Sequence, residues 1–208
     1  MATRIALDGV GGQGVRVIAG VLGALLARMG KQVTVLFDYD SSVRGSMSDA
    51  FVIFDDAPIA NPVVEEADIM LKLADKGHLR ISGRKVVTDL GLGRSGDEQI
   101  PFAALGGEHF GKELFGNMIA LGRLLRLAEI EFNDASIRES LPRRYQDENV
   151  AAIRYGYELT PEEIARLAEA APPSRFEMND AATAPHHRET GIGPGGAVAP
   201  IGEAAETG

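Results

Sequence analysis

Short apolar runs and longer helical patterns alternate through the first half of this chain. Apolar runs of strand length lie at residues 4–8, 32–37, 49–54, 69–73, 86–88 and 99–101, and helical spacing covers 14–28 before Gly30. A second, short helical pattern lies at 62–67. Because strands that alternate with helices form a mostly parallel sheet, these patterns predict an α/β fold with helices on both faces of the sheet.

The second half of the chain has helical spacing almost throughout. Apolar residues recur at Leu114, Met118, Leu121 and Leu125, which predicts one core-facing helix over 110–127. Three further helices are expected to end near residues 141, 157 and 170. The first of them can be capped by Asn133 or Asp134, and Thr160-Pro161-Glu162-Glu163 is a typical start for the last.

These patterns divide the chain into one domain and a tail. We expect a single domain over residues 1–171, with a helical part from about 133 to 171. Residues 172–208 are rich in glycine, alanine and proline and have few large apolar side chains. They cannot bury enough surface to fold alone, so we predict an extended or disordered tail.

Composition narrows the possible functions. The net charge of −9 argues against nucleic-acid binding, which needs a basic surface. No apolar run is long enough to span a bilayer and no secretory signal opens the chain, so we expect a cytoplasmic protein without a membrane partner. The chain has no cysteine, so it cannot build a thiolate-held zinc site or a cysteine-ligated iron–sulfur cluster.

The most informative motif is the segment Asp8-Gly9-Val10-Gly11-Gly12-Gln13-Gly14, between the first predicted strand and the first predicted helix. Its spacing is that of the G-x-G-x-x-G dinucleotide fingerprint of Rossmann-like domains, and Asp38 follows the second predicted strand as the ribose-binding acid does. The alternative is structural: the glycines let the strand, the helix and a neighbouring chain pack closely. These residues alone leave both interpretations open.

Later motifs favour a third interpretation. Gly11-Gly12-Gln13-Gly14, the Arg44-Gly45-Ser46-x-Ser48 loop and Asn117-Met118-Ile119-Ala120-Leu121-Gly122 together resemble the gamma subunit, or fused gamma domain, of the 2-oxoacid:acceptor oxidoreductases. The resemblance runs from about Arg4 to Gly156 and includes Asn149-x-x-Ala152-x-x-x-Gly156. At Ser46 the chain differs from the family, which usually has glycine there.

The resemblance implies a Rossmann-like, non-redox subunit of a thiamine-dependent enzyme that passes electrons to ferredoxin or a similar acceptor. Thiamine diphosphate and magnesium would lie between alpha and beta subunits, and the iron–sulfur clusters on a partner subunit or ferredoxin-like domain. This chain alone would bind no cofactor and would be inactive. Coenzyme A would be a co-substrate whose entry route the gamma subunit helps to form.

The resemblance also names the candidate site residues, which are Gly11, Gly12, Gln13, Gly14, Arg44, Gly45 and Ser46. They would form a coenzyme A site or an interface loop, and Arg44 supplies the guanidinium fork suited to a phosphate or carboxylate. Arg44 could instead pair with Asp38, Asp40 or a partner chain.

No catalytic residues are predicted, because the sequence has no Ser–His–Asp arrangement, nucleophile elbow or P-loop lysine. No metal-binding residues are predicted, because His78, His109 and His186-His187 have no metal-ligand spacing. Two alternatives to the subunit remain: a free-standing NAD(P)- or FAD-binding enzyme, and a nucleotide-sensing or scaffold protein. The sequence does not identify the 2-oxoacid.

Overall fold

A six-stranded sheet forms the centre of the molecule. The computed structural model describes residues 2–39, 47–74, 79, 81–92 and 96–170. The strands are β1 (Thr3–Asp8), β2 (Gln32–Tyr39), β3 (Ser48–Asp55), β4 (Glu66–Lys72), β5 (Ser82–Asp89) and β6 (Glu98–Ile100), in the spatial order β2-β3-β1-β4-β5-β6. Every strand except β3 runs in the same direction. The α/β class and the mostly parallel sheet are therefore confirmed.

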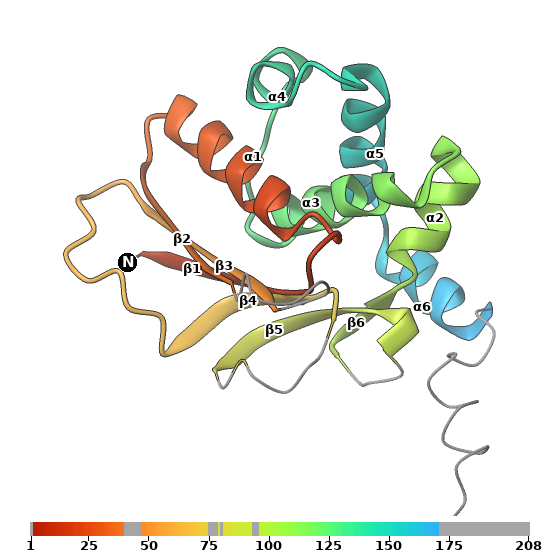
Figure 1. Cartoon of the computed structure of the whole chain (residues 1–208), viewed down its shortest axis with the longest axis horizontal. Helices are drawn as coiled ribbons and strands as arrows, with labels where there is room; N and C mark the ends of the chain where they lie inside the picture. The colour runs from red at the N-terminus through yellow and green to blue at the C-terminus, as the bar shows by residue number, and fades with distance from the viewer. Residues whose placement is uncertain (1, 40–46, 75–78, 80, 93–95, 171–208) are drawn as a thin grey trace, which may run out of the picture.

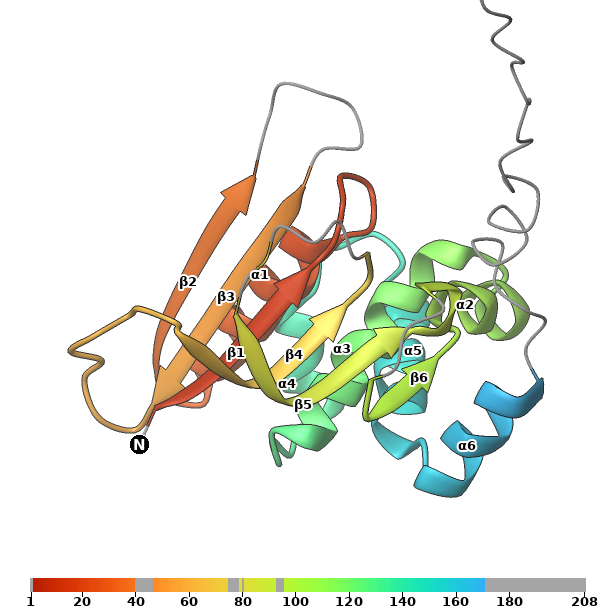
Figure 2. The ribbon, with the colours of Figure 1, turned by 90° about the horizontal axis from the view of Figure 1, so that it is seen from below.

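Most of the helices form two layers above the sheet, and the last helix lies beside its edge (Figure 1). They are α1 (Val15–Arg28), α2 (Phe102–Phe110), α3 (Gly116–Leu127), α4 (Asp134–Ser140), α5 (Gln146–Glu158) and α6 (Pro161–Ala170), with 3₁₀ turns η1 (Leu90–Leu92) and η2 (Glu113–Phe115). α1 packs on β2 and β3, and α3 reaches β4. α4 then packs on α1 and α5 on α3, while α6 lies against β6 (Figure 2).

The described helices lie on one face of the sheet, whereas the sequence predicted helices on both faces. All six helices of the described residues contribute to one large apolar cluster, together with Ile5 and Leu7 of β1. On the other face, Ala6 and Met70 belong to a small cluster built only from strands and the segments that connect them. In the described part of the chain, helices therefore cover one face of the sheet.

Two of the helix predictions were wrong: one helix is absent, and the other is divided. Residues 62–67 form no helix: the Asn61 Oδ1 atom accepts a hydrogen bond from the Val63 amide at 3.0 Å, and β4 begins at Glu66. The predicted helix over 110–127 is divided, because Gly111 ends α2 with a left-handed φ of 77° before η2 and α3. α2 itself was not expected.

The remaining helices follow their predicted signals. Asn133 caps α4 and forms a reciprocal capping box with Ser136. The Glu163 amide donates to the Thr160 hydroxyl at 3.2 Å, and the Glu163 carboxylate accepts from the Thr160 amide at 2.8 Å. The predicted boundary between domain and tail at 171–172 lies outside the described residues.

α3 and α5 cross at two glycines. A Cβ on Gly122 would meet the backbone of Ile153 and the Tyr157 nitrogen, and a Cβ on Gly156 would meet the backbone of Ile119. The two helix backbones thus touch directly, which only glycine permits. This contact explains why the motifs Asn117–Gly122 and Asn149–Gly156 each end in glycine.

Candidate functional site

The glycine turn connects β1 to α1 at the carboxyl edge of the sheet. The backbone amide of Gln13 donates to the Val10 carbonyl at 3.1 Å, and this hydrogen bond closes the turn. Gly12 and Gly14 have left-handed φ values of 100° and 81°. Residues other than glycine rarely adopt these backbone angles. The shape of the turn therefore requires glycine at both positions, whatever the turn binds.

The side chain of Gln13 holds the turn in place. Its Oε1 atom accepts from the Val10 amide at 2.9 Å, and its Nε2 atom donates to the Leu73 carbonyl at 2.7 Å. Leu73 directly follows β4, and its own amide donates to the Asp8 carbonyl at 2.8 Å. Gln13 therefore links the turn after β1 to the end of the neighbouring parallel strand.

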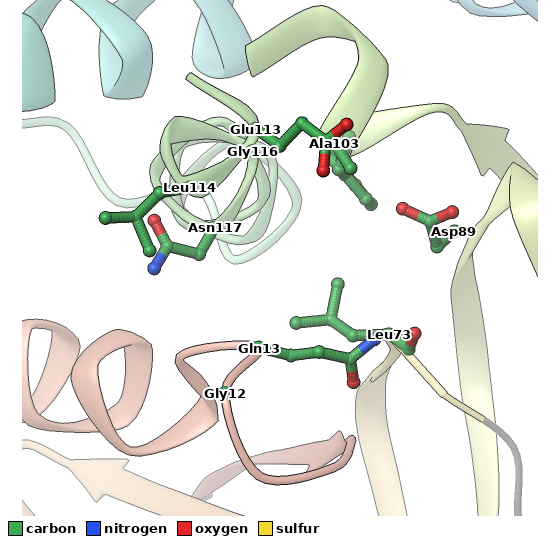
Figure 3. Close-up of a pocket in the computed structure, with 10 residues that line it drawn as sticks. Gly12, Gln13, Leu73, Asp89, Ala103, Glu113, Leu114, Gly116 and Asn117 are labelled. Atoms are coloured by element: carbon green, nitrogen blue, oxygen red, sulfur yellow. Dashed lines mark hydrogen bonds between the residues drawn. The ribbon is translucent and has the colours of Figure 1, made fainter. Parts of the chain in front are cut away.

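A crevice of about 400 Å³ opens beside this turn. Its lining includes Gly12, Gln13, Leu73, Asp89, Glu113 and Asn117 (Figure 3). The chain leaves β1 toward β2 on one side and leaves β4 toward β5 on the other. The crevice lies at this reversal, where open α/β sheets generally bind their ligands.

The charged groups of the crevice are acidic. Among the described lining residues, only Asp89 and Glu113 carry a charge. Burial is the largest influence on Asp89 and raises its pKa, although the amides of Gly91, Phe102 and Ala103 donate to it and act in the opposite direction. Phe102 and Ala103 open α2. The carboxylate of Asp89 therefore occupies the amino end of α2 and leaves no anion site there.

The arrangement of the strands does not reproduce a dinucleotide site. In the standard Rossmann order the second strand adjoins the first, so its terminal acid reaches the ribose. Here β3 lies between β1 and β2, and Asp38 is paired across the sheet with Asp49 of β3. Two strand spacings, about 10 Å, separate β2 from β1. The match between Asp38 and the fingerprint is therefore one of sequence spacing alone.

The Asn117 motif contacts the glycine turn. A Cβ on Gly14 would collide with the side-chain amide of Asn117, which projects from the start of α3 toward the turn (Figure 3). Two motifs about a hundred residues apart are thus adjacent in space. Sequence order gave no sign of this contact, because it joins residues distant along the chain.

Arg44, Gly45 and Ser46 lie outside the described residues, so their predicted roles stay predictions. The residues that follow them are described. The Ser48 amide donates to the Gly9 carbonyl at 2.9 Å, and Met47 forms a bridge with Val10. The chain therefore emerges from that segment directly beside the glycine turn.

Two residues of the crevice were missed by sequence reasoning. Asp89 ends β5 and Glu113 begins η2, and both line the crevice. A polar residue directly after an apolar strand was the available signal for Asp89. His109, for which the sequence predicted no metal-binding role, packs on the Tyr155 ring with centroids 4.7 Å apart. His78 lies outside the described residues.

The described residues contain neither a metal-binding cluster nor a membrane-spanning helix. No group of three or more histidine, aspartate or glutamate side chains among them could hold a metal ion. None of the described helices has the length and apolar character needed to cross a membrane.

These features define a Rossmann-like α/β domain with a glycine turn at its switch point and no dinucleotide acid in place. The family model described as pyruvate ferredoxin/flavodoxin oxidoreductase matches residues 4–91. The chain is 32% identical to the 2-oxoglutarate synthase subunit KorC of Archaeoglobus fulgidus over 167 residues, which cover 74% of this chain and 86% of that protein. It is 29% identical to KorC of Methanocaldococcus jannaschii over 181 residues, 78% of this chain and 96% of that protein.

Solved structures agree on the fold. The gamma subunit of a keto/oxoacid ferredoxin oxidoreductase from Geobacter sulfurreducens matches with a TM-score of 0.61 at 22% identity, covering 76% of this chain and 95% of that one. The pyruvate oxidoreductase subunit PORC of Thermotoga maritima matches with a TM-score of 0.59 at 19% identity, covering 76% and 96%. The chain belongs to the 2-oxoacid ferredoxin oxidoreductase family and is similar to the KorC subunits of 2-oxoglutarate synthase.

Proposed function

We propose that this chain is the non-redox gamma subunit of a thiamine-diphosphate-dependent enzyme that converts a 2-oxoacid to an acyl-CoA and passes electrons to ferredoxin or a similar acceptor. The observation that carries the proposal is the 32% identity to a 2-oxoglutarate synthase subunit across 86% of that protein. It makes 2-oxoglutarate the first substrate to test.

The composition of the chain supports placing the redox groups on partner subunits. Without any cysteine, the chain offers no thiolate ligands for iron–sulfur clusters. We infer that a ferredoxin-like subunit or domain holds the clusters and that alpha and beta subunits hold thiamine diphosphate and magnesium. The gamma subunit then contributes shape and contacts rather than electron transfer.

The glycine turn is the proposed point of contact with coenzyme A or a partner loop. Gly11, Gly12, Gln13 and Gly14 expose backbone beside the crevice, and the first amides of α1 favour negative charge. Asp89 and Glu113 line the crevice and oppose the binding of a phosphate there. Phosphate binding would therefore need the Arg44 guanidinium, with Gly45 and Ser46 shaping the loop.

The position of β3 argues against the alternative of a free-standing dinucleotide enzyme, since it moves Asp38 away from the turn. No observation favours a nucleotide-sensing or scaffold protein over the subunit.

Reconstitution tests the proposal directly. The chain is produced with and without the alpha, beta and ferredoxin-like subunits, and coenzyme-A-dependent reduction of ferredoxin is followed with 2-oxoglutarate, pyruvate and a branched-chain 2-oxoacid. We expect turnover only from the assembled complex. Turnover by the chain alone, or a complex that is equally active without it, would contradict the proposal.

A further inference from the structure

A second cavity of about 370 Å³ lies beside the crevice and is mostly apolar. Leu114 and Asn117 line both cavities and form the wall between them. Val17 of α1 and Leu114 of η2 keep 42% and 55% of their surfaces exposed. Large apolar side chains on both sides of one hollow are typical of a surface that another protein covers.

Two cations meet at one tyrosine on the rim of this cavity. Lys112 Nζ and Arg144 Nη2 each donate to the Tyr145 hydroxyl at 2.8 Å. Nζ also lies 4.0 Å from the centroid of the Tyr145 ring, and the Arg144 guanidinium carbon lies 4.7 Å from it. Lys112 and Arg144 are exposed, and their partner is an uncharged phenol.

No described carboxylate pairs directly with the two cations of this rim. Throughout the described part of the chain, neither Lys112 nor Arg144 forms an ion pair with a carboxylate. The same hydrogen bonds from Lys112 and Arg144 lower the pKa of Tyr145, and no carboxylate of the described residues contributes to that shift. A basic rim on a chain with net charge −9 is a local exception that selects an acidic partner.

Tyr145 is fixed in an unusual conformation. Its φ of 58° lies in the left-handed region, which aromatic residues rarely adopt, and it precedes α5 directly. Its ring meets the Phe115 ring edge to face, with centroids 5.8 Å apart. Such a backbone persists only where its surroundings impose it, so the Tyr145 ring and its hydroxyl are presented in a set position.

We propose that the Tyr145 groove, defined by Val17, Lys112, Leu114, Met118, Arg144 and Tyr145, binds an apolar segment of a partner subunit that carries a carboxylate. Lys112 and Arg144 would pair with the carboxylate, and Val17 and Leu114 would be covered by the apolar side chains. A small phosphate would satisfy the cations but would leave both apolar residues exposed. The inference rests on the proposed function, because its occupant is a subunit of the same oxidoreductase.

Charge reversal in the full-length chain tests the groove. Arg144→Glu and Lys112→Glu, both at exposed positions, should each raise the dissociation constant for the isolated alpha–beta partner subunits by about ten-fold or more. Leu114→Ser should weaken binding without changing its salt dependence. Arg166→Glu is the matched control, since Arg166 is exposed on α6 and does not line the groove.

The outcomes separate this inference from the proposed function. Weaker binding by the groove variants, with the Arg166→Glu chain unaffected, supports the inference. Wild-type binding by all variants overturns it and leaves the proposed function intact. A wild-type chain that does not bind the partner subunits overturns both. Binding of pyrophosphate that Arg144→Glu abolishes, with unchanged subunit assembly, would assign the groove to a small anion and overturn the inference.

Discussion

The carbonyl group of Ile119 in α3 lies where a side chain on Gly156 of α5 would begin. One turn further along, Gly122 stands in the same relation to Ile153. The two helices can approach this closely only because neither glycine has a Cβ. Backbone, rather than a flexible side chain, is what a substituted residue would meet.

Gly156→Ala and Gly122→Ala should therefore each destabilise the fold strongly. Overpacking against a rigid neighbour costs about 1–3 kcal/mol and more where backbone must move. Urea unfolding followed by circular dichroism measures the free energy of unfolding. Gly20→Ala is the control: Gly20 lies within α1 with nothing near its missing Cβ, and the substitution should stabilise by about 0.5–1 kcal/mol. Equal effects at Gly156 and Gly20 would refute the close crossing.

A comparison of Gly14 with Gly12 separates the cost of backbone strain from the cost of a clash with Asn117. Both have left-handed φ, but only Gly14 has a neighbour, Asn117, at the position of the missing Cβ. Gly12→Ala should cost about 1–2 kcal/mol from backbone strain alone. Gly14→Ala should cost more, and Asn117→Ala in the same chain should recover the difference. Equal free energies of unfolding for the two single variants would contradict the contact.

The buried pair of Glu98 and Arg123 predicts a pH dependence. Arg123 Nε and Nη2 donate to the two Glu98 oxygens at 2.6 and 2.7 Å, and Nη1 donates to the Leu159 carbonyl at 2.8 Å. Burial alone would raise the pKa of Glu98, but the hydrogen bonds and charge of Arg123, assisted by Lys85, lower it overall. A lowered pKa contributes stability that is present above the carboxyl's unfolded pKa and is lost as the pH falls through the folded one.

Glu98→Gln should therefore destabilise the chain at pH 7 by about 3 kcal/mol, because it leaves Arg123 buried without its counter-charge. Its stability should also fall less than that of the wild type between pH 6 and pH 3, roughly the range of carboxyl titration. Glu139→Gln removes the exposed pair with Arg28 and should cost less than about 1 kcal/mol. If the free energy of unfolding had the same pH dependence in the wild type and in Glu98→Gln, the pKa of Glu98 would not be lowered in the folded state.

The dinucleotide fingerprint should not bind a dinucleotide tightly. Since β3 separates Asp38 from the glycine turn, titration calorimetry should give no micromolar dissociation constant for NAD, NADP or FAD. The Asp38→Ala chain provides the comparison. Tight binding by the wild type that Asp38→Ala abolishes would restore the dinucleotide interpretation.

Arg44 gives a functional prediction for the assembled enzyme. If its guanidinium holds coenzyme A, Arg44→Ala should lower coenzyme-dependent turnover about ten-fold or more, which corresponds to the loss of a charge-assisted hydrogen bond of about 1.5–3 kcal/mol. Arg44→Lys should recover only part of the loss, because an ammonium group lacks the planar fork. Unchanged kinetics in an intact complex would place Arg44 in a solvated loop, and loss of assembly would make it an interface residue.

Local pattern predicted the elements around the site well. The strand expected at 4–8 and the helix expected at 14–28 agree with β1 and α1 to within one residue at each end. The pattern failed where distant contacts decide the structure. α2 was missed because Gly106 and Gly107 weaken its helical signal, yet a Cβ on Gly106 would come within 2.5 Å of the Gly116 nitrogen.

The site was predicted in the same partial way. The glycine turn could be located from spacing, but its bond to Leu73 and its contact with Asn117 join residues far apart in sequence. The place of β3 between β1 and β2 is likewise a property of strand order, which periodicity does not determine. Asp38 therefore matched a motif whose geometry is absent.

The two hydrogen bonds of the Gln13 side chain have a consequence for association. A free glycine-rich turn samples many conformations, and ordering it on contact would reduce the affinity of whatever binds there. Gln13 fixes this turn to the end of β4 before any contact is made. The loss of conformational entropy is thus incurred when the chain folds, and the turn meets its ligand or partner as a preorganised surface.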